Sequence, residues 1–446
     1  MNYKFIFMVI ILIIQNSVSN TLKGGSTMKK WSFLLLCILF LGGSGFAQKK
    51  RSPKQERYGY TLEKNRSFLR IPFQFLSNLI VVPVKLNDSD TLNFILDTGV
   101  STIILTDPSI AAKQKMKSIR SVSITGAGEG ESLNASVVLS NTIRMNGMVA
   151  YNQNIVVLEE DKLALSEYVG IPIHGIFGYD VFNNFVVTID FALREITLEL
   201  PTKYKYRKNA GDKYPIVIEH AKPYLVDIAI VDGGHEVPLK LLIDTGAGHA
   251  ISLNQTANDK IRLPDKVVRV QLGRGLSGII NGSLGRVQKL KLGKLELDNI
   301  VASFPDSSSY ANKLPTALGR QGGIGCELLR RFRITFNYTD GFIVLKPVKR
   351  RIREPFEHNM SGMELIAKGK DYKEFIVEKV VDNSPAYEAG LQEGDQLIII
   401  GNRHTSDLTI SEVYKMFQKG EGKEITVLAK RADRVFFTNF FLRRII

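Results

Sequence analysis

The chain has 446 residues, of which 44% are hydrophobic and 23% are charged. These proportions are typical of a globular protein and exclude a largely disordered one, and the length predicts roughly two to four domains. The formal net charge of +15 favours acidic partners or surfaces. The basic clusters at 203–208 and 349–351 are typical of solvated connectors, and no zinc-ligand spacing or phosphate-loop motif accompanies them. A nucleic-acid-binding module is therefore not predicted.

Two apolar segments, residues 5–14 and 31–41, lie near the N-terminus. The second is preceded by Met28 and two lysines and is followed by small residues that end at Ala47. These are the three parts of a secretory signal. We therefore expect translation from Met28, cleavage of a leader within 1–47, and an exported bacterial protein that is periplasmic, bound to the cell envelope or secreted. Neither segment is long enough to span a membrane comfortably, and membrane association through an uncleaved N-terminus is the alternative.

The chain offers little material for disulfide or metal chemistry. It has two cysteines, Cys37 in the leader and Cys326, so a mature chain without the leader has no intramolecular disulfide. Cys326 stands among apolar residues, and we expect a buried small side chain there. The six histidines show no metal-ligand spacing. We expect neither a metal nor a cofactor.

After a polar, basic stretch at 48–69, which we interpret as a flexible lead-in, strand patterns begin. Residues 80–86 and 93–96 flank a turn of polar residues, and residues 224–230 and 239–243 flank the turn Asp-Gly-Gly. Both patterns are hairpin signals. Long helical periodicity is scarce through both regions, so both are expected to be all-β.

Each hairpin signal ends in the same motif. An apolar run leads into Asp-Thr-Gly at Asp97 and again at Asp244. After each Asp, a Gly-rich stretch begins 29 residues later and an apolar-Gly turn ends 81 residues later, at the four glycines Gly126, Gly273, Gly178 and Gly325. Matched spacings across three landmarks indicate an internal duplication. For either Asp alone, the capping of a local turn is the alternative.

Two Asp-Thr-Gly motifs in the same apolar context resemble the aspartic peptidase family, of pepsin-like and retropepsin-like type. The resemblance covers roughly residues 70–348. It implies a mainly β fold in which two homologous lobes, residues 70–205 and 206–348, form a bilobal barrel-type structure. It also implies that Asp97 and Asp244 form one catalytic dyad that activates water, without a metal or a covalent intermediate.

The resemblance assigns roles to further residues. Dyad support falls to Thr98, Gly99, Ser101, Thr245 and Gly246, with the two threonines cross-linking the two loops through hydroxyl–backbone hydrogen bonds. The Gly-rich stretches lie where the family has its flap, a hairpin that closes over substrate. The flap candidates are Gly126, Gly128, Gly273 and Gly275, and a plain surface turn is the alternative for each stretch.

The two copies differ close to the dyad. The first has Ser101 four residues after the Asp, whereas the second has Gly248 there, followed by His249. Gly323 also stands where an apolar residue is expected in the second apolar-Gly turn. The second lobe could therefore be a weakened partner. His249 is expected to be exposed or hydrogen-bonded, with a contact to Asp244 as the alternative.

A charged connector at 349–358 leads into a third segment, residues 359–446. Its Ser-Pro-Ala…Ala-Gly-Leu…Gly-Asp sequence, from Ser384 to Asp395, resembles bacterial PDZ domains, which are small β-barrels with two helices. Such domains capture peptide ends as an added strand. The resemblance implies a peptide-binding site at Gly362, Met363, Glu364 and Leu365. Glu364 is an unusual neighbour for a peptide carboxylate.

Together these features predict an exported aspartic endopeptidase whose PDZ domain binds or regulates peptides. Its partners would be peptide or protein substrates and a C-terminal peptide ligand of the PDZ domain, with no nucleic acid and no metal. The alternative is a noncatalytic peptide-binding or envelope interaction protein that retains the protease fold. Substrate specificity does not follow from the sequence.

Overall fold

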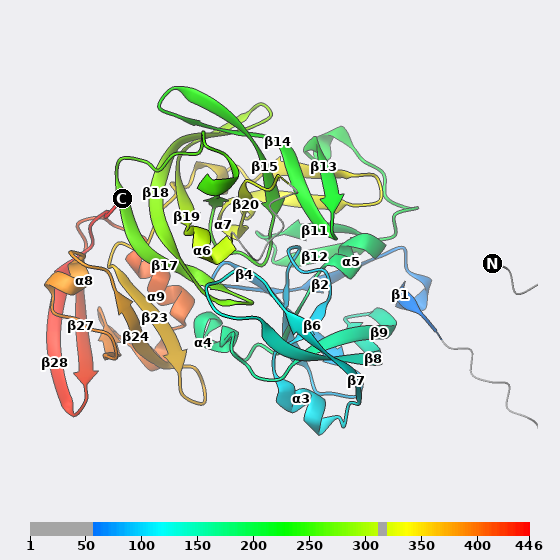
Figure 1. The fold of residues 1–446 in the computed structure, drawn as a ribbon, viewed down its shortest axis with the longest axis horizontal. Helices are drawn as coiled ribbons and strands as arrows, with labels where there is room; N and C mark the ends of the chain where they lie inside the picture. Colours follow the sequence, from blue (N-terminus) through cyan, green and yellow to red (C-terminus); the bar gives the residue numbers. More distant parts are fainter. Residues whose placement is uncertain (1–56, 311–318) are drawn as a thin grey trace, which may run out of the picture. The chain divides into compact units, whose positions relative to one another are not determined.

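The computed structural model describes residues 57–310 and 319–446. The expected leader, with its start at Met28 and its cleavage at Ala47, lies outside the described residues. Residues 57–446 form one compact unit, and its fold is mainly β, as Figure 1 shows. No helix among the described residues is long and apolar enough to cross a membrane.

The first lobe is built around a closed six-stranded barrel. Its strands are β4 (Leu79–Leu86), β5 (Leu92–Leu96), β6 (Ile103–Leu105), β8 (Leu133–Met145), β9 (Met148–Leu158) and β10 (Gly175–Phe177). They follow the order β9-β6-β10-β5-β4-β8, and the pairing of β8 with β9 closes the ring. Outside the ring, β1 (Gly59–Leu62) pairs with β9, β3 (Gln74–Leu76) with β4, and β7 (Ser118–Ile124) with β8.

The second lobe repeats this arrangement strand for strand. Its barrel strands are β14 (Lys222–Asp232), β15 (His235–Ile243), β16 (Ile251–Leu253), β18 (Gly278–Leu292), β19 (Leu295–Pro305) and β20 (Gly322–Ile324). Their order is β18-β19-β16-β20-β15-β14, closed by the pairing of β18 with β14. β17 (Val267–Gly275) extends β18 as a long hairpin. The duplication seen in the sequence is therefore also a duplication of the fold.

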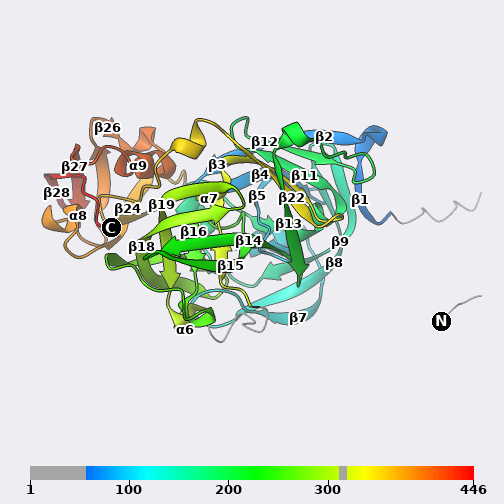
Figure 2. The ribbon, with the colours of Figure 1, turned by 90° about the horizontal axis from the view of Figure 1, so that it is seen from above.

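A shared sheet joins the two lobes (Figure 2). It contains β2 (Phe68–Pro72), β11 (Val186–Asp190) and β12 (Glu195–Glu199) from the first lobe, and β13 (Asp212–Glu219), β21 (Phe332–Asn337) and β22 (Phe342–Pro347) from the second. At its centre β11 pairs antiparallel with β21, and Thr188 lies opposite Thr335. The hydrophobic core beneath this sheet is continuous across both lobes.

Short helices connect the strands. They are α3 (Pro108–Lys113), α4 (Leu165–Val169), α5 (Tyr179–Asn184), α6 (Ser307–Tyr310) and α7 (Cys326–Leu329), with 3-10 turns η1 (Glu63–Asn65), η2 (Lys208–Ala210), η3 (Gln255–Ala257) and η5 (Arg351–Arg353). α5 and α7 each begin directly after the apolar-Gly turn of their lobe.

Residues from Met363 onward form a separate sheet with its own core. Its strands are β23 (Met363–Lys368), β24 (Glu374–Val380), β25 (Gln396–Ile400), β26 (Arg403–His404), β27 (Glu424–Arg431) and β28 (Arg434–Phe441), with η6 (Thr405–Asp407) beside them. α8 (Pro385–Glu388) starts at the capping residue Ser384, whose side chain accepts a hydrogen bond from the Tyr387 N–H. α9 (Ile410–Phe417) starts with a capping box formed by Thr409 and Glu412.

Two segments that we interpreted as loose are ordered. β1 lies within the expected lead-in at 48–69, and β2 begins at its end. Both are ordered because they pair with the edges of β9 and β12. The charged connector at 349–358 is packed rather than solvated. Phe356 is buried, and the carbonyls of Arg351, Glu354 and Pro355 accept hydrogen bonds from the buried Arg331. The charged sequence concealed this because its charges are paired within the fold, Glu354 with Arg330 and Glu357 with Arg286, and these partners lie far away in sequence.

Candidate active site

Each Asp-Thr-Gly motif stands at the end of a barrel strand that is held from both sides. β5 runs parallel to β10, and β15 runs parallel to β20. The ladder continues one residue beyond each strand, because the Asp97 N–H donates to the Phe177 carbonyl at 2.8 Å and the Asp244 N–H donates to the Ile324 carbonyl at 2.9 Å. The apolar-Gly turn of each lobe therefore fixes the backbone of its aspartate.

The two motifs are cross-linked through their threonines, which are fully buried. The Thr98 hydroxyl donates to the Ile243 carbonyl at 2.6 Å and accepts the Thr245 N–H at 3.0 Å. The Thr245 hydroxyl donates to the Leu96 carbonyl at 2.8 Å and accepts the Thr98 N–H at 3.0 Å. Each lobe thus supplies half of a reciprocal network that sets the separation of the two aspartates.

This network brings the two carboxyl groups together. Asp97 Oδ1 accepts the Gly99 N–H at 2.6 Å, and Asp244 Oδ1 accepts the Gly246 N–H at 2.9 Å. A side-chain hydrogen bond joins Asp97 to Asp244. The packing tolerates only glycine here, since a Cβ on Gly246 would lie 2.2 Å from Asp97 Cγ. The site is a carboxyl pair drawn equally from the two lobes.

The pair favours retention of a proton. Burial, followed by the negative charge of Asp244 and the hydrogen bond to it, raises the Asp97 pKa well above its ordinary value. The Gly99 N–H and the Lys222 charge oppose this shift. Two carboxyl groups at hydrogen-bonding distance cannot both ionise readily, so they share a proton. The arrangement can both take and give a proton at neighbouring positions.

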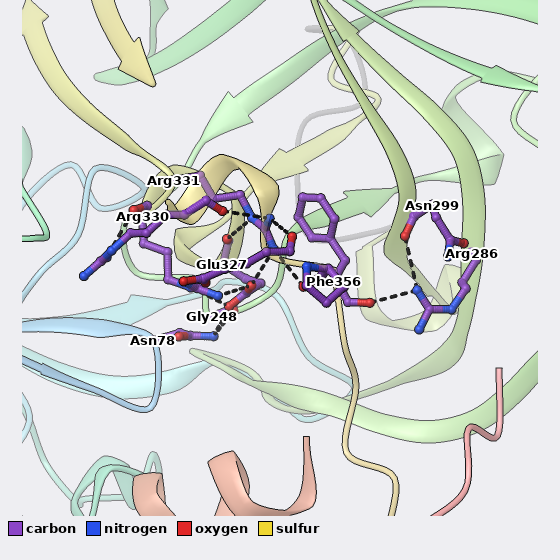
Figure 3. A network of polar contacts seen from close by, with 11 residues as sticks. Asn78, Gly248, Arg286, Asn299, Glu327, Arg330, Arg331 and Phe356 are labelled. Carbon is purple, nitrogen blue, oxygen red and sulfur yellow. Dashed lines mark hydrogen bonds and ion pairs between the residues drawn. The ribbon is translucent and has the colours of Figure 1, made fainter. Parts of the chain in front are cut away.

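The two lobes differ at the fourth position after each aspartate, as the sequence indicated. Ser101 is exposed. At the matching position of the second lobe, the Gly248 carbonyl accepts a hydrogen bond from the Asn78 amide at 3.1 Å, and this amide also donates to Glu327 at 3.2 Å. Figure 3 shows this bridge beside the buried Arg331. A first-lobe side chain therefore holds the second aspartate loop where the second lobe lacks a hydroxyl.

The two Gly-rich stretches meet each other. Gly126 and Gly128 lie in the loop between β7 and β8, whereas Gly273 and Gly275 lie in β17 near the tip of its hairpin. Ser277, at that tip, accepts the Gly126 N–H on its hydroxyl at 3.1 Å and donates its own N–H to the Ala127 carbonyl at 2.9 Å. The flap candidates are thus joined tip to tip in this structure.

In two side chains near the dyad, those of Cys326 and His249, the Sγ and Nε2 atoms are shielded from solvent. The Cys326 thiol is fully buried and donates to the Thr245 carbonyl at 3.4 Å, and burial raises its pKa well above the ordinary value. It packs as a small apolar residue, as expected. His249 is not exposed, because its Nε2 is shielded from solvent, and it has a backbone hydrogen bond with Gly323, in agreement with the hydrogen-bonded form of the expectation. Burial lowers its pKa to about 4, against the opposing effect of Asp244.

Sequence reasoning missed Lys222, the first residue of β14. The β14–β15 register pairs Tyr224 with Leu242, and two residues further it places Lys222 opposite Asp244. Its amine is in the field of both carboxylates, which raise its pKa, although burial has the larger effect and lowers it. The matching residue in the first lobe is Leu79, at the start of β4. Near the turn, Asp232 pairs with His235, and that register would place Pro223 opposite Asp244. A bulge between Leu225 and Ile228 shifts the pairing by one residue, so that Lys222 takes this place.

Gly362, Met363, Glu364 and Leu365 lie at and just before the start of β23, on an edge of the C-terminal sheet. They belong to a different sheet from the two aspartates, so they form a second candidate site. Among the described residues, no cluster of three or more His, Cys, Asp or Glu side chains is arranged to hold a metal ion.

Comparisons with known proteins agree with this division of the chain. An aspartyl protease family model matches twice, at residues 82–181 and 226–326. A PDZ domain model matches residues 376–431. No curated protein matches the chain. The two matches of the first model contain the two aspartates and end near the two apolar-Gly turns.

Proposed function

Because the chain consists of two aspartyl protease lobes followed by a PDZ domain, we propose that it is an aspartic endopeptidase that hydrolyses peptide bonds. One observation carries this proposal. The carboxyl groups of Asp97 and Asp244 lie side by side within one chain, since a Cβ on Gly99 would lie 3.0 Å from Asp97 Oδ1 and 3.1 Å from both Asp244 carboxyl oxygens, and each carboxyl group has the same glycine N–H contact.

The chemistry follows from the shared proton. In the proposed mechanism Asp97, whose pKa is raised, holds the proton and donates a hydrogen bond to the carbonyl oxygen of the scissile bond. Ionised Asp244 accepts a proton from a water molecule as its oxygen attacks the carbonyl carbon. The tetrahedral intermediate collapses when Asp244 passes the proton that it took from the water to the amide nitrogen, the carbon–nitrogen bond breaks and the amine leaves. No covalent bond to the protein forms, and the dyad returns to its singly protonated state.

The tip-to-tip contact of the Gly-rich stretches fits a flap role. A substrate has to separate Ser277 from the 126–130 loop before it reaches the dyad from that side, and the contact consists of a few hydrogen bonds. Segments that open in this way sequester a reaction from bulk water. We assign both Gly-rich stretches to flaps, one from each lobe.

Export and peptide capture complete the proposal. The leader features at Met28 and Ala47 support export to the periplasm, the cell envelope or the medium, and N-terminal mass spectrometry of the native protein tests this. Peptides from residues 1–40 in a soluble mature protein would contradict cleavage. The PDZ domain has a core of its own, so a fragment of residues 356–446 is expected to fold.

The decisive experiment is cleavage of a mixed peptide library by three variants. Asp97→Asn and Asp244→Asn are each expected to remove hydrolysis while the fold is kept, because residues that share one proton act as a unit. Asp107→Asn is the matched control, since Asp107 caps α3 and Asn caps helices equally well.

Two further results would discriminate the alternatives. A peptide analogue with a hydroxyl in place of the scissile carbonyl, such as pepstatin, should bind the parent protein more tightly than the substrate does. Tight binding of peptides without any hydrolysis would favour the noncatalytic peptide-binding protein, for which the absence of a second-lobe hydroxyl at Gly248 is the supporting observation. Full activity of Asp244→Asn would contradict the dyad.

A further inference from the structure

A cavity of about 260 Å³ lies between the second-lobe hairpin and the PDZ domain. On the protease side it is lined by residues of β17, from Val270 to Gly273, and on the PDZ side by residues of the β23 edge and by Tyr414 of α9. One wall of the cavity therefore belongs to the hairpin whose tip meets the first lobe. The other wall is the edge strand on which a PDZ domain adds a peptide strand.

The middle of that edge strand is already occupied. The Tyr414 hydroxyl accepts the Leu365 N–H at 2.8 Å and lies 3.2 Å from the Leu365 carbonyl, to which it donates. A peptide backbone cannot pair with Leu365 unless it displaces this tyrosine. Recognition in this cavity therefore depends on side chains more than on an uninterrupted strand ladder.

The polar groups of the cavity suggest what it recognises. Glu364 lines it, and burial raises its pKa to about 7, against the charge of Lys379 on the neighbouring strand and the Gln271 N–H. A further cation in the cavity would favour its ionised form. His358 also lines it and is 5% exposed. Its Nε2 accepts the Ile445 N–H, while Nδ1 is buried without a partner among the described residues. In a neutral imidazole Nδ1 then carries the proton, which leaves a donor in need of an acceptor.

In the wall of the cavity, three parts of the chain meet at one carboxylate, that of Glu378. Glu378 of β24 accepts the Tyr168 hydroxyl at 2.5 Å and pairs with Arg274 of the hairpin at 3.4 Å. Arg274 in turn donates to the Tyr168 hydroxyl at 2.8 Å. Tyr168 comes from α4 in the first lobe, so this node ties the hairpin to the PDZ domain and to the opposite lobe.

We propose that the cavity is an effector site for an extended peptide segment that carries a lysine or arginine side chain. The cationic group pairs with Glu364, and a peptide carbonyl accepts the His358 N–H. The same cation competes with Arg274 for Glu378, so that occupancy loosens the hairpin. This inference rests on the proposed function only for its effect on catalysis, because the binding itself does not require an active dyad.

The binding test uses full-length Asp97→Asn protein, so that no peptide is cleaved. The probes are two capped heptapeptides of alternating valine and threonine with a central lysine or a central norleucine, and a third with norleucine and a free C-terminal carboxylate. The lysine peptide should bind about tenfold more tightly than its norleucine counterpart, which corresponds to about 1.4 kcal/mol. Glu364→Gln should abolish this difference. Lys368→Ala, which breaks a separate PDZ contact to Glu167, should retain it.

Hydrogen exchange on the same inactive protein tests the effect on the hairpin. Saturation with the lysine peptide should increase amide exchange at residues 267–285, and Glu378→Gln should produce that increase without peptide. Equal binding of the lysine and norleucine peptides, preference for the free carboxylate, or absence of binding would each overturn the proposal. If the inactive variant binds the lysine peptide but the parent protein hydrolyses no library peptide, the proposed function is refuted and the proposal for this cavity is retained.

Discussion

The threonine cross-link provides the sharpest test of how the two lobes are held together. Thr98→Val keeps the shape of the side chain and removes its hydroxyl. The Thr245 N–H loses its acceptor and the Ile243 carbonyl loses a donor, at a position with no solvent exposure. An unsatisfied buried polar group costs about 1–3 kcal/mol. The variant should therefore lose about 2–6 kcal/mol of unfolding free energy, and its hydrolytic activity should fall with the geometry of the dyad.

A second threonine pair in the same fold serves as the control. Thr188 and Thr335 are also buried and face each other across the interlobe sheet, and their hydroxyls are 2.8 Å apart. Each hydroxyl is the side-chain partner of the other, so Thr188→Val leaves one unsatisfied group. The double variant with Thr335→Val leaves none and should recover most of the stability. At the cross-link the double variant with Thr245→Val should recover nothing, because the orphaned groups belong to the backbone.

Urea unfolding of the four single and two double variants measures these differences. The coupling energy of each pair follows from its double-mutant cycle. Recovery of stability in the Thr98→Val/Thr245→Val protein would refute the reasoning, since it would mean that the motif backbones are satisfied without the hydroxyls. Equal losses for Thr98→Val and Thr188→Val would refute it as well.

Three other predictions concern the same region. Asp97 has a raised pKa in the folded state, so its contribution to stability is present below the unfolded-state pKa and is lost as pH rises through the folded-state pKa. Asp97→Asn should therefore unfold at higher urea than the parent at pH 7.5, with the gap closing at pH 4. Arg331→Met should lose roughly 3 kcal/mol or more in urea unfolding because the Arg351, Glu354 and Pro355 carbonyls lose their buried donor, at about 1–3 kcal/mol each, although Glu327 keeps its pair with Arg330. Arg269→Met, at an exposed pair, should lose under about 1 kcal/mol. Gly246→Ala should abolish peptide hydrolysis, since its Cβ would lie 2.2 Å from Asp97 Cγ; unchanged turnover would contradict the placement of the carboxyl pair.

The sequence predicted the lobes well because its signals were local and repeated. An apolar run, a glycine turn and equal spacings recur in both copies, and the resulting barrels match strand for strand. The Ser-Pro sequence at the start of α8 was equally local. β1 escaped prediction because a short polar strand at a sheet edge carries little alternation, and its place depends on the free edge of β9.

The interdomain features could not be predicted for a different reason. Tyr168, Arg274 and Glu378 are separated from one another by 104 to 210 residues in sequence, and no period or motif marks them as neighbours. Lys222 reaches the dyad only because a bulge shifts the β14–β15 register. Contacts of this kind depend on tertiary packing, which a single sequence does not reveal.

Lys222 also shows what is gained when both lobes belong to one polypeptide. In a protease assembled from two identical chains, every side chain beside the dyad appears twice, and a cation on one side implies a cation on the other. Here the position that holds Lys222 in one lobe holds Leu79 in the other. Duplication within one chain therefore allows the two sides of the carboxyl pair to differ, with a cation in the field of both carboxyl groups on one side and an apolar side chain on the other. In the proposed peptidase such asymmetry would distinguish the two directions of a bound peptide.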